Sequence, residues 1–306
     1  MNNEVILCGL IGDPVEHSVS PLLFKYYAKS AGLNNYYHFK FKVDKRVKDE
    51  LKRTVEGIKA FSMRGYNITL PYKIKIMKYV DILDKQAERI GAVNVILNKN
   101  RKILGYNTDG VGFIRSLETS VRNVLSTDKV VIFGAGGASR AICSELYART
   151  KNLVIINRDL KEGLVLKNRL ELWGGKGVKL LIFNDVNLKR EMLDANIICN
   201  TTPVGMFPSN EECLISDETF KYLSNNRKSW KNIIFCDAIF NPYKTKFLVQ
   251  AEKLGATSLS GVGMMVFQAV EAFNIWTGKR VNTKTIKQAY KLVNLALKNA
   301  NKKRTG

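Results

Sequence analysis

The sequence predicts an α/β protein with two domains, the second of them built on a doubly wound parallel sheet. Segments with the spacing of strands and of helices alternate along most of the chain. A glycine-rich turn at residues 134–139 stands between a short apolar run and a helix-forming stretch, which is the arrangement of a βαβ unit. The 306 residues suffice for two domains of about 150 residues, each with its own core.

The composition excludes several classes of protein. Apolar residues make up 45% of the chain and charged residues 25%, ordinary values for a globular protein that argue against disorder and against a coiled coil. No apolar run approaches the roughly 18 residues of a membrane span, and the N-terminus lacks the basic and long apolar regions of a secretory signal. We therefore expect a cytoplasmic protein that does not bind a membrane.

Residues that commonly bind metals are few. Only two histidines occur, His17 and His38, which excludes a site with several histidine ligands and leaves little room for a Ser-His-Asp triad. The five cysteines form no CxxC pair, and four of them lie in or beside apolar stretches. We expect buried free thiols and no metal site.

Lysine and arginine outnumber aspartate and glutamate by 49 to 27, a formal net charge of +22. Such a balance is compatible with nucleic-acid binding. The basic residues are interspersed with acidic ones, however, which favours a lysine-rich surface with no nucleic-acid partner. Attraction of an anionic substrate and cofactor to a positive cleft is a third interpretation.

The first hundred residues predict an α/β unit. Residues 37–43 alternate, with Tyr37, Phe39 and Phe41 on one face, and this pattern predicts a half-buried strand. Ser20 followed by proline is typical of a helix start, and Pro71 predicts the start of another helix. The other predictions are strands at 5–10 and 65–70, a helix at 47–58, and a hairpin that joins 92–97 to 103–106.

A second unit begins near Lys129 and repeats the order strand, helix, strand. The predicted strands are 130–133, 153–156, 178–183, 196–199 and 233–237, and the predicted helices are 140–149, 245–254, 262–277 and 283–298. We expect the last two helices to pack back on the first unit. The first domain is then discontinuous, with residues 1–108 and 261–306, and residues 109–260 form a Rossmann-like second domain.

The glycine-rich turn is a candidate dinucleotide site. Gly134 allows a tight turn, Gly136 lets the backbone approach a pyrophosphate, and Gly137 adds room. Ser139 takes the place of the third small residue. The pyrophosphate would lie at the N-terminus of the following helix, where unpaired N–H groups and the helix dipole favour an anion.

The end of the second strand of such a domain indicates which cofactor binds. A carboxylate there binds the ribose 2′-hydroxyl of NAD, whereas an arginine suits the 2′-phosphate of NADP. Asn157 and Arg158 stand at this place and favour NADP. Asp159 follows at once, so NAD remains a second possibility.

The first domain carries polar residues at the ends of predicted strands and helices, where open α/β sheets build their binding sites. Lys73 is notable among them, because a lysine in the first turn of a helix opposes the helix dipole and suggests another purpose. The others that we single out are Ser18, Ser20, Asn67, Thr69, Asn94 and Asp109.

Together these motifs closely resemble the shikimate dehydrogenase family, including its quinate/shikimate branch. The resemblance covers nearly the whole chain, and the motifs occur in the order of the family. They are His17-Ser-Val-Ser-Pro21, Asn67-Ile-Thr-Leu-Pro-Tyr-Lys73, Gly91-Ala-Val-Asn94, Asn107-Thr-Asp109-Gly, Gly134-Ala-Gly-Gly-Ala138, Asn157-Arg158, Asn200-Thr-Thr-Pro-Val-Gly-Met206, Asn241-Pro242 with Thr245, and Gly261-Val-Gly-Met264 with Gln268.

The resemblance implies a role for each matching residue. Lys73 would be the catalytic group, with Asp109 beside it. The substrate-binding residues would be Ser18 and Ser20 for the carboxylate, and Asn67, Thr69, Asn94, Asp109 and Gln268 for the rest of the molecule. The cofactor-binding residues would be Gly134, Ala135, Gly136, Gly137 and Ala138 for the pyrophosphate, Asn157, Arg158 and Asp159 for the adenosine ribose, and Ala238 and Gly261 for the nicotinamide.

Two residues depart from the family pattern. Phe240 stands where the family usually has a substrate-binding tyrosine, so one hydroxyl contact is missing. Glu162 stands where NADP-specific members often carry a second basic residue, which puts strict NADP specificity in doubt.

The resemblance implies the reversible NADPH-linked reduction of 3-dehydroshikimate to shikimate, in the pathway to chorismate and the aromatic amino acids. It is compatible with a homodimer. Two alternatives stay open: a quinate/shikimate dehydrogenase that uses NAD or NADP, and, more remotely, a basic module that binds nucleic acid.

Overall fold

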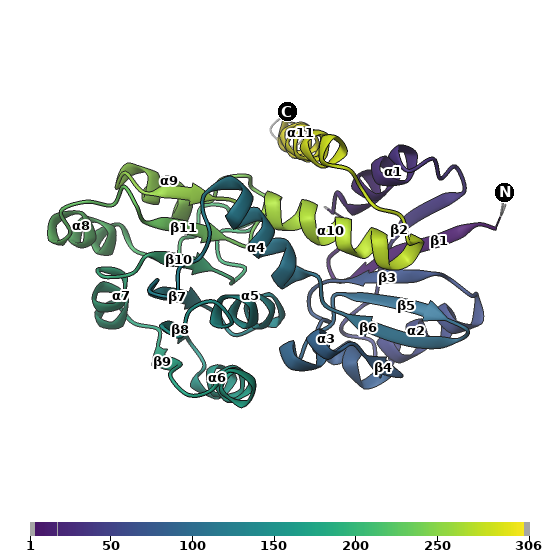
Figure 1. Ribbon diagram of the computed structural model, residues 1–306, viewed down its shortest axis with the longest axis horizontal. Coiled ribbons are helices and arrows are strands. Elements are labelled where there is room, and N and C mark those ends of the chain that lie inside the picture. The colour runs from purple at the N-terminus through teal and green to yellow at the C-terminus, as the bar shows by residue number, and fades with distance from the viewer. Residues whose placement is uncertain (1–3, 17, 303–306) are drawn as a thin grey trace. The chain divides into compact units, whose positions relative to one another are not determined.

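The computed structural model describes residues 4–16 and 18–302, and it consists of two compact units (Figure 1). The first unit holds the chain up to Thr108 together with the residues from Val266 onward. The second unit is Asp109–Met265. Each unit is built on one six-stranded sheet.

The sheet of the first unit is mixed. Its strand order is β2-β1-β3-β5-β6-β4, with β1 parallel to β2 and β3, and β5 antiparallel to β3 and β6. The carboxyl ends of β1, β3 and β6 and the amino end of β5 therefore share one edge. The strands are β1 (Ile6–Gly12), β2 (Tyr36–Lys42), β3 (Gly65–Ile68), β4 (Ile82–Leu83), β5 (Val95–Lys99) and β6 (Lys102–Tyr106).

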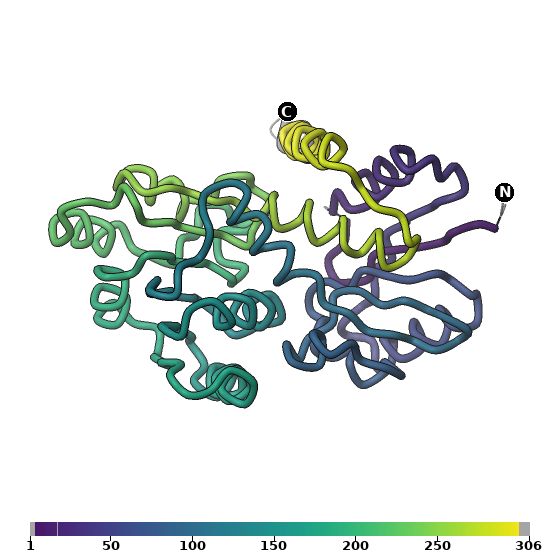
Figure 2. Tube along the Cα trace, in the orientation of Figure 1, coloured from purple at the N-terminus to yellow at the C-terminus, as the bar shows by residue number. Residues whose placement is uncertain are grey.

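Helices pack on this sheet around buried side chains such as Tyr66, Ile76 and Ile96. The long C-terminal helix α11 lies against α1, so helices far apart in the sequence pack together in one unit (Figure 2). The helices are α1 (Ser20–Ser30), α2 (Glu50–Ala60), the 3₁₀ helix η1 (Lys75–Tyr79), α3 (Lys85–Ile90), α10 (Val262–Thr277) and α11 (Thr283–Lys302).

The prediction of strand β2 is confirmed, but its apolar face is not buried. Tyr37 and Phe39 are about half exposed, at 47% and 51%, whereas Tyr36 and His38 on the opposite face are buried. The reason is position: β2 is the last strand of the sheet, and α1 and α10 cover the face that carries His38. The aromatic face is left on the surface.

The helix predicted to start at Pro71 does not form there. A turn follows Pro71, and only the short 3₁₀ helix η1 forms, from Lys75. Lys73 thus lies in the turn before η1. The argument from an opposing helix dipole therefore does not apply to Lys73.

The sheet of the second unit is entirely parallel, with the order β12-β11-β10-β7-β8-β9. This is the doubly wound order of dinucleotide-binding domains, so the predicted fold class is confirmed. The strands are β7 (Val130–Phe133), β8 (Leu153–Asn157), β9 (Lys179–Ile182), β10 (Ile197–Asn200), β11 (Ile234–Asp237) and β12 (Thr257–Leu259).

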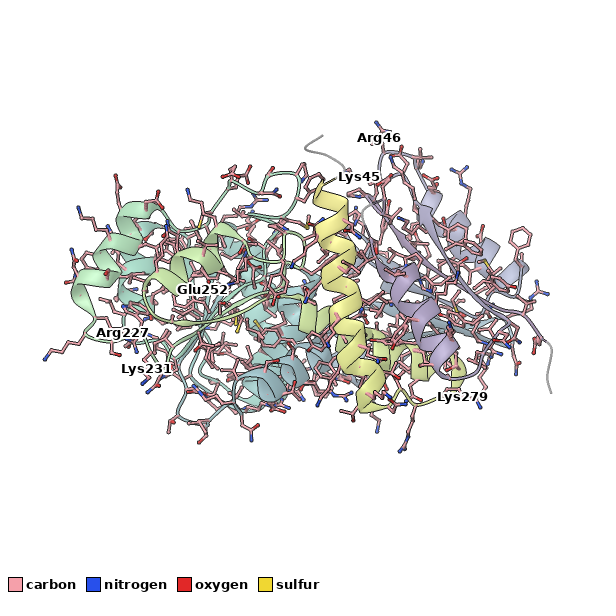
Figure 3. The ribbon with its side chains drawn as sticks, turned by 90° about the horizontal axis from the view of Figure 1, so that it is seen from above. Lys45, Arg46, Arg227, Lys231, Glu252 and Lys279 are labelled. Carbon is pink, nitrogen blue, oxygen red and sulfur yellow. The ribbon has the colours of Figure 1, made fainter. Side chains whose placement is uncertain are left out.

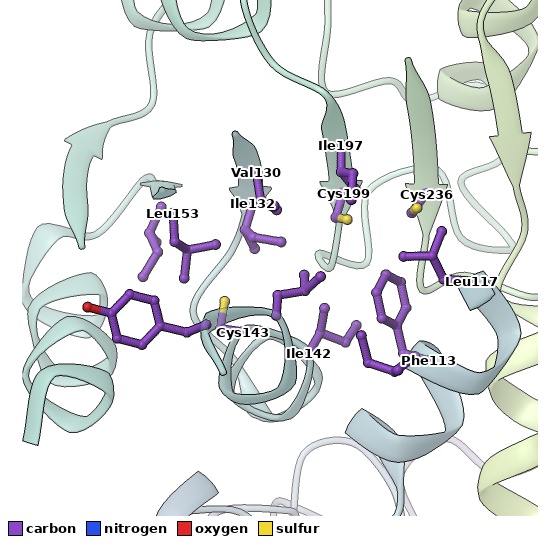
Figure 4. Close-up of a cluster of buried hydrophobic side chains, with 14 of the residues drawn as sticks. Phe113, Leu117, Val130, Ile132, Ile142, Cys143, Leu153, Ile197, Cys199 and Cys236 are labelled. Atoms are coloured by element: carbon purple, nitrogen blue, oxygen red, sulfur yellow. The ribbon is translucent and has the colours of Figure 1, made fainter. Parts of the chain in front are cut away.

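Alternate residues of the buried strands face two cores. Val130 and Ile132 of β7 pack toward α4 and α5 (Figure 4), and Val131 and Phe133 pack toward the other face. The helices are α4 (Asp109–Ser120), α5 (Gly137–Tyr147), α6 (Leu160–Gly174), α7 (Asp185–Met192), α8 (Asp217–Asn226) and α9 (Lys246–Lys253).

The five cysteines are free thiols, as predicted, and all but Cys213 are buried. Cys143, Cys199 and Cys236 belong to one core cluster (Figure 4). Burial raises the pKa of Cys8 and of Cys143 to about 12. Such thiols pack as small apolar groups and are poor nucleophiles.

An ion cluster around the buried carboxylate of Glu191 lies at the amino-terminal edge of the second sheet. The Glu191 carboxylate accepts hydrogen bonds from Lys179 Nζ at 2.6 Å and Arg190 Nε at 2.8 Å, and pairs with Lys129 Nζ at 2.9 Å. Burial alone would raise the pKa of Glu191, but these three cations outweigh it and lower the pKa to about 2. The cluster stabilises the edge opposite to the strand ends that bind ligands in such folds.

Basic side chains are spread over both units. Figure 3 labels Lys45 in the first unit and Lys231 in the second among the side chains that stand on the surface. Within the part of the chain that the structure describes, no helix is long and apolar enough to cross a membrane.

The burial of His38 affects how the stability of the first unit depends on pH. Its ring stacks on Phe24 at 4.5 Å, and its buried Nε2 makes no hydrogen bond. Burial lowers the pKa of His38 to about 3, so between pH 6.5 and 3 the unfolded chain takes up a proton that the folded chain does not. Stability is then complete above pH 6.5 and is lost as the pH falls.

We therefore expect His38→Phe to gain about 2 kcal/mol over wild type in the free energy of unfolding when the pH is lowered from 7 to 5. Phenylalanine keeps the stacking on Phe24 but does not titrate. Urea unfolding of both proteins at the two pH values measures this difference. Parallel losses in both proteins would show that folding does not lower the pKa of His38, and would contradict the prediction.

Candidate active site

The pairing of the strands in the first sheet determines where the predicted polar residues lie. Thr69 donates its backbone N–H to Ile11, and Asp13 donates to Leu70, so the loops after β1 and β3 run side by side. Ile68 donates to the carbonyl of Asn94, at the start of the antiparallel strand β5. Residues distant in sequence thus reach the same sheet edge.

Asn94 is the centre of this polar group. It is 2% exposed, and its Oδ1 accepts the backbone N–H of Thr108 at 2.8 Å. Its Nδ2 lies 3.0 Å from Thr108 Oγ1 and 3.4 Å from Gln268 Oε1 on α10. Asn94 therefore joins the end of β6 to a helix that lies far along the chain.

Lys73 is held beside Asn94 by its main chain. The Lys73 carbonyl accepts the N–H of Val93 at 2.8 Å, and the turn before it is closed by a bond from the Tyr72 N–H to Thr69 at 2.9 Å. Asn67 is 5% exposed, and its Oδ1 makes no hydrogen bond. That oxygen can accept a hydrogen bond from a ligand.

Ser18 and Ser20 lie at the start of α1. Ser18 Oγ donates to Ser20 Oγ at 2.9 Å, and the Ser20 N–H donates to Ser18 Oγ at 3.2 Å. Lys40 of β2 donates from its ammonium to the carbonyl of Glu16 at 2.5 Å. Hydroxyls, helix N–H groups and a nearby cation suit a carboxylate ligand. His17, within the same motif, lies outside the described residues.

The glycine-rich loop of the second unit joins β7 to α5 as predicted. Gly134 has a φ of +108°, which requires glycine, and Ser139 Oγ donates to its carbonyl at 2.6 Å. A Cβ on Gly136 would meet nothing within 4 Å, and Gly136 caps α5 without a side chain. The backbone at Gly136 is therefore open to close approach at the start of α5, and this fits a pyrophosphate at the helix N-terminus.

Asp159 caps the N-terminus of α6. Its Oδ1 accepts the N–H groups of Lys161 at 2.8 Å and of Glu162 at 3.4 Å, so Asp159 is the N-cap of the helix. Asn157 Nδ2 donates to the Asp159 carbonyl at 2.7 Å. Arg158, between them, is exposed. The carboxylate is engaged by its own helix, while the guanidinium is accessible to a ligand.

Gly261 lies against the strand end after β11. A Cβ on Gly261 would lie 2.4 Å from the carbonyl oxygen of Ala238, and its N–H donates to Ile239 at 3.0 Å. Phe240 follows in the same segment and is partly buried. The structure therefore brings together Ala238 and Gly261, the two residues that the family resemblance assigns to the nicotinamide.

Lys73 and Asp109 belong to different units: Lys73 lies in the first, whereas Asp109 begins α4 in the second and is 4% exposed. Thr108, which Asn94 holds, is the residue just before Asp109. Thr108 lies within the motif Asn107-Thr-Asp109-Gly, but its sequence pattern does not show that it binds Asn94; only the fold brings the two together.

The comparisons with known proteins agree with these motifs. The family model described as "Shikimate dehydrogenase substrate binding domain" matches residues 10–96, and "Shikimate 5'-dehydrogenase C-terminal domain" matches residues 261–289. A shikimate dehydrogenase (NADP(+)) of Methanococcus maripaludis is 39% identical over 290 residues, covering 94% of this chain and 97% of that protein.

The chain belongs to the shikimate dehydrogenase family. Solved structures of the family have the same fold. A crystal structure of shikimate dehydrogenase in complex with NADP⁺ matches with a TM-score of 0.81 at 37% identity, covering 95% of this chain and 96% of that one. Shikimate 5-dehydrogenase from Listeria monocytogenes, in complex with shikimate and NAD, matches with a TM-score of 0.80 at 32% identity, covering 93% and 96%.

Proposed function

We propose that this chain is an oxidoreductase that catalyses the reversible, NADPH-linked reduction of 3-dehydroshikimate to shikimate, on the route to chorismate and the aromatic amino acids. The observation that carries the proposal is the family likeness, which spans 94% of the chain. The meeting of the motif residues Asn94 and Gln268 at one sheet edge beside the Lys73 turn supports it. Such a cluster of strand-end groups is how open α/β sheets bind small polar molecules.

The first unit is the proposed substrate-binding domain. Ser18 and Ser20 hold the carboxylate at the N-terminus of α1. Hydrogen-bonding groups for the ring hydroxyls come from Asn67, Thr69, Asn94 and Gln268. Asp109, which the resemblance also assigns to the substrate, belongs to the second unit. Phe240 offers its ring without a hydroxyl, which leaves one polar contact fewer than a tyrosine would give. The net charge of +22 favours the approach of this anionic substrate.

The second unit is the proposed NADP-binding domain. Gly134, Ala135, Gly136, Gly137 and Ala138 take the pyrophosphate. Asn157 and Arg158 meet the adenosine ribose, with Asp159 capping the helix behind them. Ala238 and Gly261 line the nicotinamide. NAD remains a second possible cofactor, because Glu162 places a negative charge in the first turn of α6 that would repel the 2′-phosphate of NADP.

Lys73 is the proposed catalytic group. When bound, NADPH supplies the hydride that reduces the carbonyl carbon of the substrate. Negative charge then develops on the carbonyl oxygen, and a donor must neutralise it. The ammonium of Lys73 stabilises that oxygen and gives it a proton. Asp109 is the second catalytic residue that the family resemblance implies.

The proposal is tested by following the absorbance of reduced cofactor with purified protein. Shikimate with NADP should give the highest kcat/KM among the four pairs of shikimate or quinate with NADP or NAD. A higher value for quinate, or for NAD, would favour the quinate/shikimate alternative. Absence of turnover together with tight, salt-dependent binding of duplex DNA would favour the nucleic-acid alternative.

Lys73→Ala should lower kcat by roughly 100-fold or more, which is typical when a general acid is lost, with a smaller change in KM. Steady-state kinetics with shikimate and NADP measure both parameters. Lys75→Ala is the matched control, because Lys75 is an exposed lysine two residues along. A kcat within a few-fold of wild type for Lys73→Ala would contradict the assignment.

Arg158→Ala should weaken NADP binding about 10- to 100-fold and NAD binding less than about threefold, because a hydrogen bond to a charged group contributes about 1.5–3 kcal/mol. Asp159→Asn keeps a capping oxygen but removes a charge, so it should leave NAD affinity nearly unchanged. Fluorescence titrations with each reduced cofactor measure the affinities. A large loss of NAD affinity in Asp159→Asn would instead make Asp159 a ribose ligand.

We also propose a homodimer that forms through the exposed aromatic face of β2. The rings of Tyr37 and Phe39 stack at 6.5 Å with an angle of 3°, on the edge strand of the sheet. Packing of this face against the same face of a second copy about a twofold axis would cover the two rings. Sedimentation velocity should show a dimer for wild type and a monomer for Phe39→Glu. A wild-type monomer at micromolar concentration would contradict the proposal.

The proposed location is the cytoplasm. The five free thiols of the described chain suit a reducing compartment, where disulfides seldom persist.

A further inference from the structure

A buried carboxylate in the second unit has no role among the residues assigned so far. Asp237 ends β11 and is 2% exposed. Its immediate neighbour, Ala238, is assigned to the nicotinamide. Asp237 lies at the carboxyl edge of the sheet, far from the Glu191 cluster at the amino edge. A buried charge at this edge needs hydrogen-bonding partners, and it has several.

Three donors converge on Asp237. Thr245 Oγ1 donates to Oδ2 at 2.7 Å, and the Ile239 N–H donates to Oδ1 at 2.9 Å. Asn200 Nδ2 lies 3.2 Å from Oδ1 and 3.3 Å from Oδ2. Asn200 and Asp237 are register partners at the ends of β10 and β11. Every contact has the carboxylate as acceptor, which suits its ionised form.

The network reaches two segments that border the cofactor site. Asn200 Oδ1 accepts the Thr202 N–H at 2.9 Å and the Thr202 hydroxyl at 2.8 Å. Thr202 in turn lies against the first glycine of the dinucleotide loop, since its Cγ2 would be 3.1 Å from a Cβ on Gly134. On the other side, the Ala238 N–H donates to the Asn200 carbonyl at 2.8 Å.

We propose that Asp237 is a positioning residue for NADP: with Asn200 and Thr245 it fixes the Asn200–Val204 turn and the Ala238–Phe240 segment at the spacing that the nicotinamide half of the cofactor needs. The proposal rests on the proposed function. Asp237 acts through these segments and does not itself touch the cofactor.

The network responds to pH. Burial raises the pKa of Asp237 to about 7, although the hydrogen bonds from Thr245, Ile239 and Asn200 oppose the rise. The charge of Asp237 interacts with the thiols of Cys199 and Cys213, and burial raises the pKa of both thiols. On α9, Lys246 is paired with Asp217 at 3.8 Å.

Protonation of Asp237 turns one of its acceptor oxygens into a donor, which displaces a partner. Because only the ionised form of Asp237 holds the two segments in place in this proposal, NADP affinity is proportional to the ionised fraction of Asp237. That fraction, and with it the affinity, falls about tenfold from pH 8 to pH 6. The effect on folding has the opposite sign. Because the folded pKa is above the unfolded value, this group lowers the stability of the fold as the pH rises toward 7.

The test is the dissociation constant of NADP⁺ for the full chain, measured by calorimetry at pH 6, 7 and 8. Asp237→Asn keeps the shape of the side chain, but its new NH₂ group faces partners that also donate hydrogen bonds. We therefore expect about tenfold weaker binding of NADP⁺ at pH 8. The step between pH 8 and pH 6 should shrink in this variant. The cofactor phosphate titrates in both proteins, so the difference between them isolates Asp237. The KM for shikimate should stay within about threefold.

Two controls separate positioning from loss of stability. Glu191→Gln removes a carboxylate that is equally buried, at 2%, but lies at the opposite edge of the sheet. It should lower the thermal stability and leave NADP⁺ affinity unchanged. If Asp237→Asn does not fold, Thr245→Val and Thr245→Ser decide: loss of the hydroxyl should weaken NADP⁺ about threefold or more, and serine should restore it.

Wild-type affinity and an unchanged pH profile in both Asp237→Asn and Thr245→Val would overturn the inference and leave the proposed function intact. Failure of the wild type to bind NADP⁺ would overturn both.

Discussion

Parallel strand pairing is the constraint on which both candidate sites depend. In the first unit β1 and β3 run parallel, so the loops that carry Ser18 and Thr69 start from the same sheet edge. In the second unit β7 and β10 run parallel, so the glycine loop and the Asn200 turn start together. A change of direction in either pair would send these loops to opposite edges, and no substitution of side chains could restore the sites.

The two units use the same device to fix these loops: a buried asparagine at a strand end. Asn94 binds the backbone N–H and the hydroxyl of Thr108, and Asn200 binds those of Thr202. Each amide has donor and acceptor sides, so it can hold one segment while it bonds to another. The main chain of these turns is thereby fixed without a regular strand or helix, and ligand-binding groups need such fixed positions.

Much of the fold and of the candidate site follows from sequence patterns. The parallel sheet of the second unit could be predicted from short apolar runs, because strands that are covered on both faces consist of consecutive apolar residues. For β2, the strand itself was predicted correctly, but the burial of its aromatic face was not, and the reason is physical. Alternation shows that two faces differ, but only the position of β2 at the sheet edge determines that the aromatic face stays exposed. The Asp237 network was missed because its members lie 8 and 37 residues apart and only the fold joins them.

Binding of each ligand to its own set of strand ends is best tested by amide hydrogen exchange with mass spectrometry. Shikimate should slow exchange in the peptides that cover residues 18–22, 67–73 and 92–95, and NADP should slow it in those that cover 134–140, 157–162, 200–204 and 238–240. Protection at these loops from one ligand should be largely independent of the other. Protection confined to other surfaces, or none with either ligand, would contradict the assignment of both sites.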